Sequence, residues 1–202
     1  MRHLAFVLAG FLTFSCQSVE KLSPPEPEPV LVDLATWGEE VFELPPGFAP
    51  HLPAGREILL FPPGWLLPET EDYWSYVFIM EMEAANLDAQ RLGELFEHYY
   101  DGLIGGVAEG KSFDVPPDPA RVTFRHERDN RYTGTVKTYD AFGVGSELTL
   151  YMILEVETKN ATTSILRIQA SPIAPGTSAI WSSLRQAVDS LKFDSLTSPN
   201  YS

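Results

Sequence analysis

The stretch YWSYVFIMEME, residues 73–83, is rich in aromatic and branched apolar residues, which is typical of a β-strand. Because strand side chains alternate between two faces, one face holds five large apolar side chains: Trp74, Tyr76, Phe78, Met80 and Met82. The opposite face becomes charged at Glu81 and Glu83. We therefore expect a strand that is central in a sheet at its start and half-exposed at its end.

An amphipathic helix is expected directly after this strand. Apolar residues recur at intervals of three and four between Leu92 and Val107, which predicts one apolar stripe. Asn86 or Asp88 can cap the start of the helix. Because glycine disfavours helix, four glycines predict that the helix ends early: Gly102, Gly105, Gly106 and Gly110.

The rest of the chain predicts an α+β fold. Further strands are expected at 57–61, 121–128, 131–140, 147–157 and 164–172, and a second helix at 177–193. The order β-β-α-β-β-β-β-α favours a single, mainly antiparallel twisted sheet with both helices packed on one face. This layout, with the closing segment SLKF at 190–193, resembles the PsbP type of α/β sandwich, and the resemblance implies a fold and no activity.

The N-terminus has the pattern of an export signal. A basic start at 1–3 precedes an apolar run at 4–14. That run is too short to cross a bilayer, which needs about 20 apolar residues, but it suits a signal peptide. With Cys16 directly after it, the segment resembles the signal of bacterial lipoproteins, in which the cysteine receives a lipid. The resemblance implies lipid attachment at Cys16.

The segment departs from the usual lipoprotein pattern at Thr13 and Phe14, so secretory cleavage after Ser18 is an alternative. The residues after Cys16 are rich in proline and acidic side chains, which predicts an extended tether that builds no core. The expected organisation is a signal at 1–16, a tether at 17–30, one α+β domain at 31–193 and a flexible tail at 194–202.

Charge and cysteine content limit the partners. The chain has 202 residues, with 14 basic and 28 acidic ones, and a net charge of −14. We expect no binding to nucleic acid, because phosphate contacts need a basic surface. The same charge disfavours docking on anionic lipid headgroups. The single cysteine excludes an intramolecular disulfide.

The sequence has no motif typical of a metal, nucleotide or nucleophile site, and we expect no metal and no cofactor. His51, His98 and His126 form no pair at ligand spacing. Ser146, His126 and Asp140 would supply the residue types of a hydrolase triad. A hydrolase whose site is assembled from distant residues is therefore kept as one alternative function.

Two aromatic clusters, at 61–65 and 73–76, indicate where a ligand could bind. Aromatic rings stack on sugars or line apolar pockets, so Trp65, Trp74 and Tyr76 are candidate ligand-binding residues. The simpler interpretation is that the strand aromatics pack in the core and Trp65, in a turn, is more exposed. The leading hypothesis is an exported, lipid-anchored, non-enzymatic binding or interaction module of the cell envelope, whose partner is an envelope protein or an apolar ligand. A binder of an apolar small ligand or a sugar is the alternative.

The anchoring hypothesis predicts the behaviour of a Cys16→Ala variant in cells. Without the thiol no lipid can be attached, so the variant is expected to move from the membrane fraction to the soluble fraction after export. Fractionation followed by immunoblotting measures this shift. A wild-type protein that is already soluble after export would contradict the hypothesis.

Overall fold

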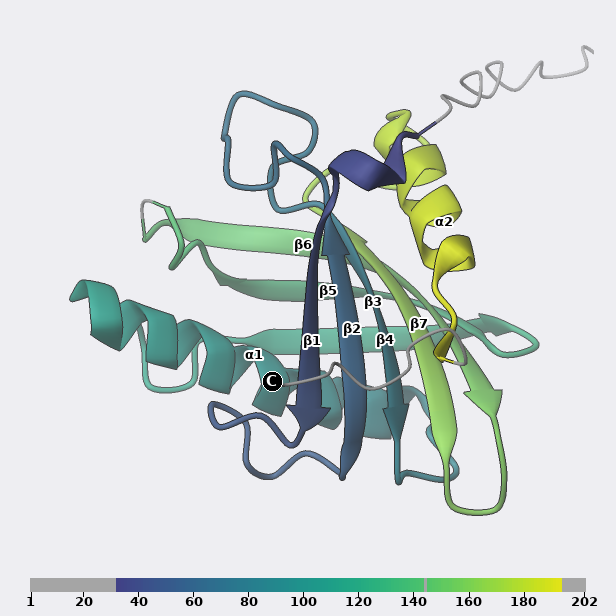
Figure 1. Cartoon of the computed structure of the whole chain (residues 1–202). Helices are drawn as coiled ribbons and strands as arrows, with labels where there is room; N and C mark the ends of the chain where they lie inside the picture. The colour runs from purple at the N-terminus through teal and green to yellow at the C-terminus, as the bar shows by residue number, and fades with distance from the viewer. Residues whose placement is uncertain (1–31, 144, 194–202) are drawn as a thin grey trace, which may run out of the picture.

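The computed structural model describes residues 32–143 and 145–193 (Figure 1). Cys16, the signal, the tether and the tail lie outside the described residues. The strands are β1 (Gly38–Leu44), β2 (Gly55–Phe61), β3 (Tyr76–Met82), β4 (Arg121–Arg128), β5 (Arg131–Tyr139), β6 (Glu147–Thr158) and β7 (Ser164–Ser171). The helices are η1 (Leu34–Thr36), α1 (Ala89–Lys111) and α2 (Ile180–Ser190).

All seven strands belong to one sheet in the order β1-β2-β3-β7-β6-β5-β4, and every neighbouring pair is antiparallel. The predicted α+β class and single antiparallel sheet are confirmed. Figure 1 shows β1, β2, β3 and β7 steeply inclined to β4, β5 and β6, so the sheet twists strongly from one edge to the other. None of the helices within residues 32–143 and 145–193 is long and apolar enough to cross a membrane.

Strand β1 was not predicted from the sequence. Its segment GEEVFEL has three glutamates and no long apolar run, which hides the pattern of a strand. The strand forms because its backbone pairs along its whole length with β2, from Gly38 opposite Phe61 to Leu44 opposite Gly55. It is an edge strand, and Glu39, Glu40 and Glu43 are exposed along it.

Strand β3 lies inside the sheet and is covered on both faces. Phe78 and Met80 pack beneath α1, as the predicted alternation requires, whereas Val77 and Ile79 pack beneath α2. All four side chains are fully buried. The two helices therefore lie on opposite faces, and the expectation that both pack on one face was wrong. The physical reason is that β3 is apolar on both faces, so each needs a cover.

Helix α1 runs to Lys111, so the expectation that glycines end it early was also wrong. Asp88 caps it, because its carboxylate accepts a hydrogen bond from the Arg91 amide at 2.9 Å. Gly102 has a packing role. A Cβ at this position would lie 1.9 Å from the carbonyl oxygen of Phe48, so only glycine lets the loop at 45–54 approach α1 so closely.

Removal of a side chain beneath α2 tests the two-sided packing. Leu184 is fully buried in α2, and Leu184→Ala should lower the free energy of unfolding by about 2–5 kcal/mol through lost contacts and a cavity. The neighbouring Arg185 is exposed, and Arg185→Ala should change the free energy of unfolding by less than about 0.5 kcal/mol. Urea unfolding of both variants measures the difference. Equal stabilities would show that α2 does not pack on the sheet.

Candidate ligand-binding site

A cavity of about 130 Å³ lies on the α1 face, where α1 meets β1, β2 and the loops beside them. Its lining is mostly aromatic: Phe42, Phe48, Phe61, Trp65, Trp74, Tyr76, Tyr99 and Phe142. Leu59 and Leu103 complete the apolar part, and Glu40 is the one charged residue among the described residues that line it. An apolar, aromatic wall with few polar groups is typical of a site for a small ligand.

The rings form a continuous chain of contacts around much of the cavity. The ring centroids of Phe61 and Trp65 are 5.0 Å apart, and those of Trp65 and Phe142 are 5.5 Å apart. Phe142 in turn lies 5.4 Å from Trp74, which is 6.4 Å from Tyr76. These spacings are those of favourable aromatic pairs, so the wall is held by its own ring contacts.

The carboxylate of Asp140 fixes two loops that form this wall. It accepts hydrogen bonds from the Trp74 indole N–H at 2.9 Å, the Tyr73 hydroxyl at 2.6 Å and the Gly143 amide at 2.8 Å. Burial is the largest cause that raises the pKa of Tyr73 to about 12, followed by its bond to Asp140. Because Asp140 is itself 1 % exposed, Trp74 and the loop that holds Phe142 are locked together.

The loop before β3 positions Trp65. The Trp74 amide donates to the Trp65 carbonyl oxygen at 2.8 Å, and the Trp65 amide donates to Pro62 at 3.1 Å. Trp74 has a positive φ of 49° and precedes β3, which begins at Tyr76 rather than at Tyr73 as the sequence predicted. The turn therefore lies before the paired part of the strand, and the Trp74 ring packs in the α1-face core.

Glu57 is a fully buried carboxyl group behind the cavity wall. Its Oε1 atom accepts a hydrogen bond from the hydroxyl of Tyr99 at 2.9 Å, and its Oε2 atom has no hydrogen-bond partner among the described residues. Its partners across the ladder are Phe42 on β1 and Met80 on β3. Burial raises the pKa of Glu57 to about 7; the Tyr99 bond opposes this shift, and the charge of Glu40 adds a smaller upward effect.

Two further tyrosines extend this polar group into the core. The hydroxyls of Tyr76 and Tyr100 are 2.5 Å apart, and both side chains are buried. Burial raises the pKa of Tyr76, Tyr99 and Tyr100 well above that of a free tyrosine, so all three are neutral at ordinary pH. The hydroxyls of the two tyrosines in the wall, Tyr76 and Tyr99, therefore bond inward, and their rings remain for the cavity.

The structure brings together the three aromatic residues nominated from the sequence. Trp65, Trp74 and Tyr76 all line the cavity; Trp74 and Tyr76 are buried, and Trp65 is half-buried. Sequence analysis missed Glu57 and Phe142. An acidic residue in the apolar strand 57–61 was the available signal for Glu57, whereas nothing local marked Phe142.

The residue types of a hydrolase triad are not brought together. His126 pairs with Tyr132 at the start of β5 and its Nε2 atom lies 2.8 Å from the Asp129 carbonyl oxygen. Asp140 follows the other end of β5, eight residues on, which at about 3.3 Å per residue is roughly 26 Å away. The proposed combination of Ser146, His126 and Asp140 is therefore wrong.

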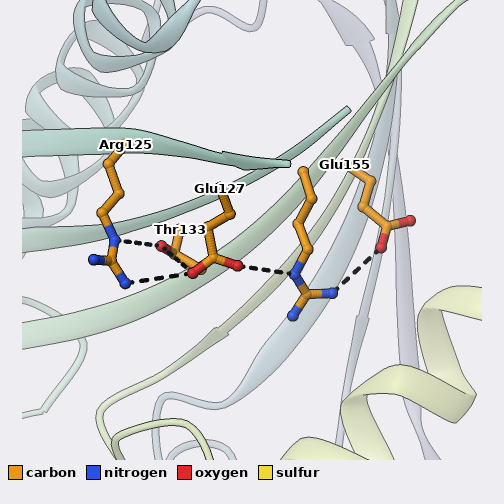
Figure 2. A network of polar contacts seen from close by, with 5 residues as sticks. Arg125, Glu127, Thr133 and Glu155 are labelled. Atoms are coloured by element: carbon orange, nitrogen blue, oxygen red, sulfur yellow. Dashed lines mark hydrogen bonds and ion pairs between the residues drawn. The ribbon is translucent and has the colours of Figure 1, made fainter. Parts of the chain in front are cut away.

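A larger, open hollow of about 500 Å³ lies over β4, β5 and β6. It is on the same face of the sheet as α2, in the part that α2 does not cover. Figure 2 shows the polar network there. Arg125 contacts Glu127 at 3.3 Å and Thr133 at 3.1 Å, and Arg131 contacts Glu127 at 3.4 Å and Glu155 at 3.5 Å. These charges already satisfy one another in contact with water, so this hollow is a weaker candidate than the aromatic cavity.

Among residues 32–143 and 145–193, no group of three or more histidine, cysteine or acidic side chains could hold a metal ion. His51 and His98 lie together on the surface, with their ring centroids 6.4 Å apart. Comparison of the chain with known protein families, curated proteins and solved structures gives no significant match. The site is therefore interpreted from its own chemistry.

The burial of Glu57 predicts a specific pH dependence of stability. Its pKa of about 7 in the folded protein exceeds the ordinary value of 4.5, so between these values the folded state holds a proton that the unfolded state has lost. This contribution to stability is present at low pH and is lost as the pH rises through 7. Glu57→Gln should remove it, and the variant should gain roughly 2 kcal/mol over the wild type between pH 5.5 and pH 8.

Urea unfolding at the two pH values measures this gain. Glu43→Gln, an exposed change on β1, is the matched control and should keep the pH dependence of the wild type. A Glu57→Gln variant whose stability follows the wild type at both pH values would show that Glu57 is ionised in the folded protein at pH 5.5.

Proposed function

We propose that the protein is an exported binding module that holds a small, largely apolar ligand in the aromatic cavity between α1 and the sheet. The observation that supports this is the cavity itself, about 130 Å³ in volume and walled by eight aromatic side chains. Interiors of proteins are close-packed, and a hollow of this size left open among rigid rings is costly to stability. A ligand that fills it recovers those contacts.

The size and polarity of the cavity favour an apolar ligand over a sugar. A cavity of about 150 Å³ accepts one benzene ring. The hydroxyls of Tyr76 and Tyr99, which could bind sugar hydroxyls, already bond to Tyr100 and Glu57. Glu40 is left as the main polar group of the wall. The chemical class is thus a single ring or a compact alkyl group.

Anchoring and location rest on the sequence. The signal-like segment at 1–16 and the acidic, Pro-rich segment at 17–30 support a module tethered through Cys16 on the periplasmic side of the envelope or at the cell surface. A net charge of −14 disfavours direct binding to anionic membranes, so a lipid at Cys16 supplies the attachment.

Binding of two small probes tests the proposal. Indole, a neutral ring, and tetramethylammonium, a cation whose surface consists of four methyl groups, are titrated against the purified protein by isothermal calorimetry. Binding of at least one probe with a Kd of about 1 mM or tighter is expected. Trp65→Ala should weaken this binding about tenfold, because it removes a half-buried ring from the wall without opening the core.

Leu67→Ala is the matched control for this substitution. Leu67 belongs to the same loop, is 53 % exposed and does not line the cavity, so its removal should leave the affinity unchanged. If neither probe binds the wild type, or if both variants bind equally well, the cavity is not a ligand site and the proposal fails.

A further inference from the structure

The aromatic cavity has carboxyl groups on several sides. Glu40 lines it from β1 and is exposed at its edge. Glu57 lies behind the wall, bonded to Tyr99, and Asp140 lies behind it on another side, bonded to Trp74. The lining residues that the structure describes include no lysine or arginine. The ammonium group of Lys111, which is exposed, bonds to the backbone oxygen of the lining residue Phe142, but Lys111 is not itself among the lining residues.

Asp140 and Glu57 accept hydrogen bonds from two aromatic side chains of the cavity wall. The Trp74 indole N–H donates to Asp140 at 2.9 Å, and the Tyr99 hydroxyl donates to Glu57 at 2.9 Å. A hydrogen bond to an anion draws the proton outward and leaves more electron density on the ring, which makes the ring face more attractive to a cation. Trp and Tyr are also the rings with the strongest cation–π attraction.

One carboxyl oxygen of Glu57 lacks a hydrogen-bond partner among the described residues. The side chain is 0 % exposed, yet its Oε2 atom has no hydrogen-bond partner in the described part of the chain. Unpartnered buried carboxyl oxygens are rare, because removal from water without compensation is costly. A positive charge placed on the far side of Tyr99 would stabilise the ionised form of Glu57 across the short distance of one ring.

We infer that the ligand of the aromatic cavity is an organic cation with a compact alkylated ammonium group. The rings replace part of the hydration of the cation, and Glu40, Glu57 and Asp140 supply the negative field. The alkyl groups fill the apolar volume of about 130 Å³. This inference rests on the proposed binding function and adds to it the charge of the ligand.

A pair of isosteric probes tests the inference. Choline contains a trimethylammonium group, and 3,3-dimethylbutan-1-ol has the same shape with a neutral carbon in place of nitrogen. At pH 8, above the pKa of about 7 of Glu57, choline is expected to bind at least tenfold more tightly than the alcohol in isothermal calorimetry.

Variants assign the preference to the carboxyl groups. Glu57→Gln and Glu40→Gln should each weaken choline binding about fivefold more than they weaken binding of the neutral alcohol. Glu43→Gln is the control, because Glu43 lies on β1 but on the opposite face from Glu40. Unfolding measurements on each variant show that the fold is intact.

The outcomes separate this inference from the proposed function. If the alcohol binds as tightly as choline, or if indole binds and choline does not, the cation preference is wrong while the cavity still binds apolar molecules. An equal loss of choline affinity in Glu40→Gln and Glu43→Gln would also overturn it, since only general surface charge would then be involved. If choline, the alcohol, indole and tetramethylammonium all fail to bind, both proposals fail.

Discussion

Burial of β3 on both faces determines the layers of this molecule. Val77 and Ile79 on one side and Phe78 and Met80 on the other leave no polar face for water. Such a strand is stable only in the interior of a sheet, with a paired strand at each edge and a cover on each side. Strand β7 must therefore return from the far end of the chain to pair with β3 opposite β2, and α1 and α2 must separate to the two faces.

The cavity is a place where the side chains of this core leave space unfilled. The rings of Trp65, Trp74 and Phe142 contact one another at their edges and leave unfilled volume, and Glu57 stands in the same region as a buried acid without a full set of partners. Each feature lowers stability. Natural proteins depart from good packing mainly where a function requires it, which is why the two departures together indicate a site.

Local patterns predicted much of the fold. The alternation in 73–83 and the capped start of α1 both depend on neighbours in sequence, and both are present in the structure. The rest depends on distant partners. Strand β1 exists through its pairing with β2, the end of α1 is kept by packing that includes the contact at Gly102, and the cavity needs Phe142 and Tyr99 from separate segments. Residue types nominated Trp65, Trp74 and Tyr76, whereas only the folded register placed Glu57 behind Tyr99.

The glutamates of β1 also affect how the protein behaves at high concentration. An open edge strand is a template for pairing with the same edge of another molecule, the first step of sheet aggregation. Two β1 strands brought edge to edge would place Glu39, Glu40 and Glu43 of one molecule near the same residues of the next, and this repulsion opposes their association. The acidic row thus lets an aromatic hollow stay open beside an unpaired edge at high protein concentration without seeding self-association.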